Sequence, residues 1–322
     1  MKKIKLAMIQ LRNHYENQAL GYKEATSLIT QAASEGAEMA ILPELSACGY
    51  IPNQSIWQYA ESNNGKTAGW ASELSALLGI YIGAGFVETD GKDFYNSYLL
   101  SNPKGGICGI IRKEDAESYC FKRCKGNLYI DTDIGRIGFG ICADNHYIQR
   151  LCRMKDVNID LMIMPHANPS PYQANKQISK KDLELFEKQP LIITTAYSNY
   201  LRVPTVYVNA VGLFPEFTGG LWFKNFNEIF RLQGGSLVTD ARGKPLVKMD
   251  NVAGYKVCDI PLDKTSEAPV EPAIYHGKWL HQGNALFRYL IMPHLIRKGI
   301  RGYNKEHLKK AKKVTTNTTK RI

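Results

Sequence analysis

The chain has 322 residues, of which 44% are apolar and 22% are charged, and its formal net charge is +11. This composition is ordinary for a globular protein, and the length allows one large domain or two of average size. No run of 18 or more apolar residues occurs, which excludes a membrane-spanning helix. The apolar run after the basic N-terminus is too short for a secretory signal, so we expect a cytoplasmic location.

The positive charge is concentrated at the end of the chain. Residues 297–321 contain ten Lys or Arg and one Glu, a net charge of +9. The rest of the chain therefore carries +2 (11 − 9 = 2), with histidine counted as neutral. A nearly neutral body without an aromatic and basic recognition motif argues against binding to nucleic acid.

The seven cysteines do not form a recognisable disulfide framework or metal site. They are Cys48, Cys108, Cys120, Cys124, Cys142, Cys152 and Cys258. Their number is odd, and only Cys120 and Cys124 are close together, without a second pair or a histidine cluster to complete a zinc site. We therefore expect free thiols and no metal.

The first part of the chain predicts alternating strands and helices. Residues 5–10 are typical of a strand, and residues 19–35 have helical spacing that ends at Gly36. Residues 39–42 predict a buried strand that runs into Pro43 and Glu44.

The same alternation continues downstream. Helices are predicted over 68–78, 147–153 and 181–189, and strands over 80–87, 95–100, 106–112, 136–142, 161–165, 191–196, 234–239, 245–249 and 254–258. Strands dominate but helices interleave with them, which predicts an α/β fold with a mixed sheet.

No Pro-, Gly- or Ser-rich break interrupts this alternation, which predicts one domain over residues 1–265. Residues 284–292 form an apolar run that we expect to end at Pro293. Residues 266–322 are therefore interpreted as a C-terminal extension with an apolar segment and a basic tail.

Three predicted strands lead directly into side chains that could perform chemistry, namely Glu44, Lys113 and Cys142. A thiol needs a base to become a thiolate, and a carboxylate can act as that base. A lysine can stabilise the oxyanion that forms when the thiolate attacks a carbonyl carbon. Each residue alone is more typical of the surface or the core, so the three are informative only if the fold brings them together.

Five segments between residues 4 and 260 occur in a characteristic order. They are the strand, helix and Gly turn that lead to Pro43-Glu44, then Ile110-Ile111-Arg112-Lys113, Gly135 to Asp144, Asn209-Ala210-Val211-Gly212, and Gly234 to Gly243. In content and order they resemble the signatures of the nitrilase, or carbon–nitrogen hydrolase, superfamily.

The resemblance implies a four-layer αββα sandwich that often assembles into homodimers or larger homo-oligomers. It implies that Cys142 is the nucleophile, Glu44 the general base, and Lys113 the stabiliser of the oxyanion together with the Ala143 backbone N–H. The expected reaction is hydrolysis of a non-peptide carbon–nitrogen bond of a small molecule, an amide or N-carbamoyl amine, through a thioester. A nitrile is the alternative substrate, and no cofactor is implied.

Many relatives carry a further catalytic glutamate after the lysine, and Glu114 and Glu117 compete for that place. Glu117 fits better, because Glu117 and Phe121 reproduce the family's spacing of Glu, three residues and Phe. The gap from Lys113 is shorter than usual.

Residues beside the cysteine and after the predicted strand 161–165 are candidates for substrate contact. They are Ala143, Asp144, His146, His166 and Asn168. Relatives often carry an aromatic residue in place of Ala143, so more room is expected beside the sulfur. His146 is equally typical of a capping or surface residue.

Other functions stay open from sequence alone. The three residues could belong to a protein that only binds or scaffolds, although an inactive site usually loses one of them. A papain-like enzyme would need a histidine directed at Cys142, and none of the seven histidines stands in a recognisable partner motif. Lipoprotein acyltransferases of the family carry membrane spans and its glutaminases feed an attached synthetase, and neither pattern occurs here.

The basic tail has two interpretations. Residues 286–292 and the cations that follow could make weak contact with an anionic membrane surface. We favour packing of the apolar run on a partner subunit, with solvated lysines and fraying after Thr315. Because the three proposed catalytic residues precede residue 150, residues 301–321 are expected to be an appendage that turnover does not need.

Overall fold

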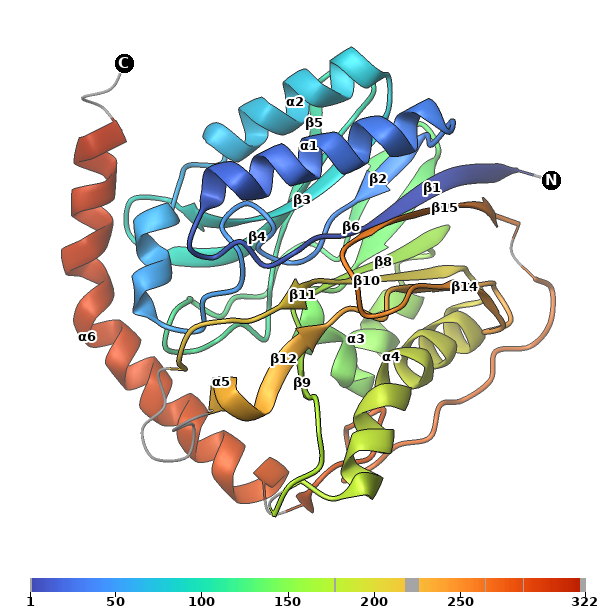
Figure 1. Ribbon diagram of the computed structural model, residues 1–322. Helices are drawn as coiled ribbons and strands as arrows, with labels where there is room; N and C mark the ends of the chain where they lie inside the picture. Colours follow the sequence, from blue (N-terminus) through green and yellow to red (C-terminus); the bar gives the residue numbers. More distant parts are fainter. Residues whose placement is uncertain (1, 177, 218–225, 264, 286, 319–322) are drawn as a thin grey trace.

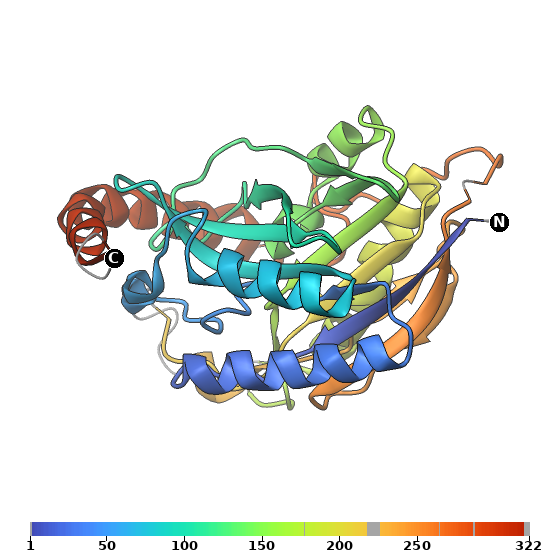
Figure 2. The same cartoon turned by 90° about the horizontal axis from the view of Figure 1, so that it is seen from above.

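Two six-stranded sheets lie face to face, and helices cover the outer face of each (Figures 1 and 2). The computed structural model describes every residue except 1, 177, 218–225, 264, 286 and 319–322. For residues 226, 287 and 308–318 it describes the backbone but not the side chains. The predicted four-layer αββα sandwich is confirmed.

The first sheet contains both the first and the last long strands. In sheet order its strands are β15 (Gly254–Pro261), β1 (Lys3–Gln10), β2 (Met39–Ile41), β3 (Tyr81–Thr89), β4 (Phe94–Ser101) and β5 (Ile107–Arg112). The pairs β1–β2 and β2–β3 are parallel, and the other pairs are antiparallel. Helices α1 (Gln18–Ser34) and α2 (Lys66–Leu78) lie side by side on its outer face (Figure 2).

The second sheet provides the other half of the sandwich. In sheet order its strands are β14 (Pro245–Lys248), β13 (Leu237–Thr239), β10 (Thr205–Asn209), β8 (Leu161–His166), β7 (Gly135–Phe139) and β6 (Tyr129–Thr132). Helices α3 (Ile148–Lys155) and α4 (Lys180–Leu201) cover its outer face. A small third sheet has the order β11 (Val211–Gly212), β12 (Phe230–Gln233) and β9 (Pro169–Pro171), and α5 (Phe226–Ile229) precedes β12.

The main core lies between the two large sheets. Leu6 and Tyr98 of the first sheet pack in one apolar cluster with Phe139, Ile163 and Val206 of the second. Further clusters lie beneath the helices on each outer face. Because each sheet is covered on both faces, central strands such as β2, β3 and β8 are buried at every residue, whereas the edge strands β14 and β15 are partly exposed.

The prediction of a strand over residues 191–196 is wrong, because these residues continue α4. Pro190 and the β-branched run after it are typical of a helix end followed by a strand. The helix instead buries Ile193, Thr194 and Tyr197 beside β10 and β13, and this tertiary packing outweighs the local preference.

The prediction that the apolar run of residues 284–292 ends at Pro293 is also wrong. A short π-helical segment, Phe287–Ile291, leads directly into α6 (Met292–Thr318). Pro293 lies in the first turn of α6, where a backbone N–H has no partner within the helix and its loss costs little.

The interpretation of residues 301–321 as an appendage needs correction at its beginning. Tyr303 is 3% exposed and His307 is 8% exposed. The Tyr303 hydroxyl accepts a hydrogen bond from the Phe94 backbone N–H at 2.9 Å. Fraying after Thr315 stays a prediction, because the description of α6 ends at Thr318 and residues 319–322 lie outside it.

Among the helices of the described residues, none combines the length and the apolar character that a membrane crossing would require.

Candidate active site

The structure brings the three predicted catalytic residues together from both sheets. Glu44 follows β2 and Lys113 follows β5, both in the first sheet. Cys142 follows β7 of the second sheet, and the strand ends of the two sheets meet at one edge of the sandwich. Residues that are far apart in sequence therefore share one buried site.

Glu44 and Lys113 form an ion pair that is closed off from solvent, with both side chains 0% exposed. Glu44 Oε1 accepts hydrogen bonds from Lys113 Nζ at 2.5 Å and from Asn96 Nδ2 at 2.7 Å. Its other oxygen accepts the Ala167 backbone N–H at 2.9 Å. These bonds fix the carboxylate in place, because each oxygen has a defined donor.

Glu117, rather than Glu114, joins this ion pair. Glu117 Oε1 accepts a second hydrogen bond from Lys113 Nζ at 2.9 Å. Glu114 instead forms ion pairs with Arg150 at 3.1 Å and with Arg153 at 2.6 Å. The short sequence gap between Lys113 and Glu117 is spanned within a non-helical loop after β5, whose bends at Glu114 and Asp115 bring the Glu117 carboxylate to the ammonium group.

The pKa of Lys113 is well above its usual value. Burial alone would lower the pKa, but the carboxylates of Glu117 and Glu44 raise it more. The lysine is therefore an ammonium group with three N–H donors, of which the described residues engage two. Among the described residues, the third N–H has no acceptor.

Cys142 begins a short 3-10 turn, Cys142–His146, at the bend between β7 and α3. Its φ of 46° lies in the left-handed region, which costs a non-glycine residue about 1 kcal/mol or more. Asp144 stabilises the turn, because its carboxylate accepts the Ile141 N–H at 3.2 Å and the Asp115 N–H at 2.7 Å. A strained turn of this kind directly after a strand is a common way to expose a reactive side chain at the end of a sheet.

Burial raises the pKa of the Cys142 thiol well above its usual value, and Glu44 adds to this effect. Lys113 and the Ala167 backbone N–H act in the opposite direction. The resting sulfur therefore carries its proton, and a base must remove that proton during attack. Burial also raises the pKa of Glu44, against the effect of Lys113, which makes Glu44 a stronger base than an exposed glutamate.

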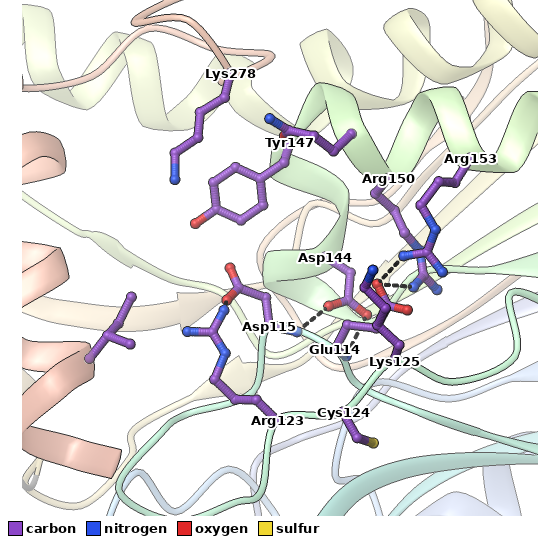
Figure 3. Close-up of a pocket in the computed structure, with 12 residues that line it drawn as sticks. Glu114, Asp115, Arg123, Cys124, Lys125, Asp144, Tyr147, Arg150, Arg153 and Lys278 are labelled. Atoms are coloured by element: carbon purple, nitrogen blue, oxygen red, sulfur yellow. Dashed lines mark hydrogen bonds and ion pairs between the residues drawn. The ribbon is translucent and has the colours of Figure 1, made fainter. Parts of the chain in front are cut away.

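A charged cavity of about 460 Å³ lies beside the turn that carries Cys142 (Figure 3). Asp144 and Tyr147 line it, together with Glu114, Asp115 and Arg123, but Cys142, Glu44 and Lys113 do not. Its acidic side chains are already engaged by arginines or backbone N–H groups. The cavity therefore adjoins the reactive groups without containing them.

The other predicted substrate contacts have protein partners. His166 Nε2 lies 3.0 Å from Asn145 Nδ2, and the His166 ring packs 4.2 Å from that of Tyr207. The Asn168 side chain donates to Gln189 Oε1 at 3.3 Å. A direct role of these residues, and of Ala143, Asp144 and His146, in binding substrate stays a prediction.

His146 connects the site to the C-terminal extension. Its Nδ1 lies 2.6 Å from His281 Nε2, and Gln189 Nε2 contacts both rings. Burial lowers the pKa of His281 to about 4, so this pair is neutral near pH 7. The backbone of Leu280 also donates to the His146 carbonyl at 3.0 Å.

Sequence reasoning missed Asn96, Ala167, Gln189 and His281. Asn96 lies inside a predicted strand, where one polar residue carries no special signal. Ala167 contributes only its backbone N–H, so its side chain gives no clue. The position of Ala167 next to the candidate His166 is the one signal that pointed to this loop.

Comparison with known proteins identifies the family of the chain. Residues 5–270 match the carbon–nitrogen hydrolase family. A nitrilase of Pyrococcus abyssi is 28% identical over 178 residues, which is 52% of this chain and 67% of that protein. A citrullinase of Francisella tularensis is 28% identical over 179 residues, 52% of this chain and 62% of that protein.

The fold has relatives among solved structures. A carbon–nitrogen hydrolase from Helicobacter pylori G27 superposes with a TM-score of 0.71 over 81% of this chain and 90% of that one, at 20% identity. The family match extends over most of the chain, from β1 through β15. The protein is therefore a member of the carbon–nitrogen hydrolase family.

Proposed function

We propose that the protein hydrolyses a non-peptide carbon–nitrogen bond in a small amide or N-carbamoyl amine through a thioester on Cys142. The observation that carries this proposal is the buried ion pair of Glu44 and Lys113 beside the thiol. A buried charge pair is expensive to maintain for stability alone, and here it supplies the base and the cation that thiol attack requires.

The first half of the proposed reaction forms the thioester. Glu44 removes the thiol proton as the Cys142 sulfur attacks the carbonyl carbon. The carbonyl oxygen becomes an oxyanion, which the free N–H of Lys113 and the Ala143 backbone N–H stabilise. Glu44 then returns the proton to the leaving nitrogen, and ammonia or an amine departs.

The second half releases the product. Glu44 removes a proton from water, and the water oxygen attacks the thioester carbon. The same donors stabilise the second oxyanion, and its collapse breaks the carbon–sulfur bond. The sulfur regains a proton and the carboxylic or carbamic acid leaves, so the enzyme returns to its starting state.

Substrate class is tested by measuring ammonia release from matched amides, N-carbamoyl amines and nitriles. The similarity to proteins named a citrullinase and a nitrilase supports including the last two classes. Mass spectrometry of rapidly quenched protein is expected to show an acyl group on the peptide that contains Cys142. A panel without turnover and without any adduct would favour the alternative, a binding or scaffold protein of the same fold.

Glu44→Gln is expected to lower kcat by about a hundredfold or more, because the amide cannot accept the thiol proton. In the wild type the base form of Glu44 is lost on acidification. Since its pKa is raised, the acidic limb of kcat/KM is expected above the ordinary glutamate value of 4.5. A pH profile whose acidic limb lies at or below 4.5 would contradict the assignment of Glu44 as the base.

Assembly into homodimers or larger oligomers, a cytoplasmic location and weak membrane contact of the tail stay predictions.

A further inference from the structure

We infer that helix α6 holds the turn that carries Glu117 in its working position, and that Gly299 is a positioning residue for the proposed reaction. This inference rests on the proposed function. It concerns a segment far from the reactive residues in sequence, since α6 begins at Met292. Figure 1 shows α6 running along one side of the molecule.

The first support is a very close approach of α6 to the turn after Glu117. A Cβ atom added to Gly299 would overlap Ser118 Oγ and lie 3.0 Å from the Tyr119 backbone nitrogen and 3.2 Å from the Ser118 carbonyl carbon. Real Cβ atoms are rarely this close to backbone atoms. Glycine at this position therefore allows the helix to rest directly on the turn.

A second contact, one helical turn further along, reaches the other end of the same turn. Tyr303 packs its ring edge against Trp57, with ring centroids 6.0 Å apart. The Trp57 indole N–H donates to the Cys120 carbonyl at 2.5 Å. The Tyr303 hydroxyl donates to Asp93 at 3.1 Å and accepts the Phe94 N–H at 2.9 Å, which fixes the ring in place.

The turn formed by residues 117–121 is short, so a displacement of Ser118 also displaces Glu117 and its contact with Lys113. The backbone N–H groups of Cys120 and Phe121 both donate to the Glu117 carbonyl at 2.9 Å. Ser118, next to Glu117, is only 5% exposed. A displacement of Ser118 therefore moves Glu117, whose carboxylate accepts the hydrogen bond from Lys113 Nζ at 2.9 Å.

A displacement of Glu117 is expected to lower the pKa of Lys113. Glu117 contributes to raising the pKa of the Lys113 ammonium group. If Glu117 moves away, that pKa falls and Lys113 loses its proton at a lower pH. Because the proposed oxyanion stabilisation needs the charged lysine, the basic limb of the pH profile moves toward lower pH.

Gly299→Ala in the full-length chain tests the inference, with Gly302→Ala as a matched control on the same helix. A Cβ on Gly302 would meet nothing within 4 Å, so both variants gain the same intrinsic helix preference but only one disturbs the turn. We expect Gly299→Ala to lower kcat by about tenfold to a hundredfold. KM should change little, the basic limb should shift to lower pH, and Gly302→Ala should match the wild type.

Two further variants separate positioning from a general loss of structure. Ser118→Ala combined with Gly299→Ala removes the overlapping hydroxyl and is expected to restore part of kcat. In a Glu117→Gln background, Gly299→Ala is expected to have little additional effect, because both changes act through the same carboxylate.

The inference is overturned if folded Gly299→Ala keeps wild-type kcat and pH dependence, or if its effect adds fully to that of Glu117→Gln. Should Gly299→Ala fail to fold, Tyr303→Phe replaces it, since this change removes the two hydroxyl bonds and keeps the ring. An unchanged pH profile in Tyr303→Phe would then reject the inference. Activity retained by Cys142→Ala would instead reject the proposed function, so the two failures are distinguishable.

Discussion

Cys142→Ala is expected to lower turnover by at least about a thousandfold while the protein stays folded. The thiol is the group that forms the covalent bond in the proposed reaction, and the alanine methyl group cannot form it. The substitution removes one buried sulfur atom, so its effect on stability should be small compared with its effect on activity. Ammonia release and thermal unfolding, measured on the same preparation, separate the two effects.

Cys152→Ala is the matched control for this experiment. Cys152 is exposed on α3 and lies outside the ion-pair network of the site. The Cys152→Ala variant should keep wild-type turnover. If Cys142→Ala kept most of its activity, the thioester mechanism would be abandoned, whatever the control showed.

Lys113→Ala is expected to damage both activity and stability. Loss of the cation that stabilises the oxyanion should lower kcat by about a hundredfold or more. The change also leaves the carboxylates of Glu44 and Glu117 in a buried site without their shared cation. Breaking a buried ion pair in this way costs about 3–5 kcal/mol, which urea unfolding would detect.

The stability of the Lys113→Ala variant is expected to decrease with increasing pH. Without Lys113, burial raises the pKa of Glu44 in the folded state above that in the unfolded state. The stability of the variant is then greatest at acidic pH, where the carboxyl group is neutral, and falls as pH rises through the folded-state pKa. Lys104→Ala, at an exposed hairpin position, should unfold like the wild type at every pH. Equal unfolding free energies for Lys113→Ala and Lys104→Ala would show that the pair contributes nothing to stability.

The sequence contained most of the information needed to place the reactive groups. Glu44, Lys113 and Cys142 each follow an apolar run typical of a strand, and ordered motifs predicted that these strands share one sheet sandwich. The sequence could not show that Asn96 and the Ala167 N–H complete the cradle around Glu44, because those contacts depend on how the two sheets approach each other. It also gave no indication that a glycine near the C-terminus touches the turn after Glu117.

Two elements of the fold differ from the sequence prediction, one for a local reason and one because of tertiary packing. Strand β10 is not among the strands that we predict from the sequence, although residues 205–209 are rich in the β-branched and aromatic types that favour strands. The error in α4 has a different origin, since residues 191–196 have strand-like composition and become helical through packing on β10 and β13. The composition of residues 205–209 alone favours a strand, whereas the helical state of residues 191–196 depends on tertiary contacts.

The pairing of β1 with β15 has a consequence for how the protein is made. Every residue of β1 is paired with this strand, from Lys3 opposite Pro261 to Gln10 opposite Gly254. During synthesis, at rates of 5–20 residues per second, β1 waits on the order of tens of seconds for this partner to leave the ribosome. Throughout that interval one edge of an apolar strand is open to pairing with other nascent chains. Newly made protein should therefore depend on chaperones until residue 261 has emerged.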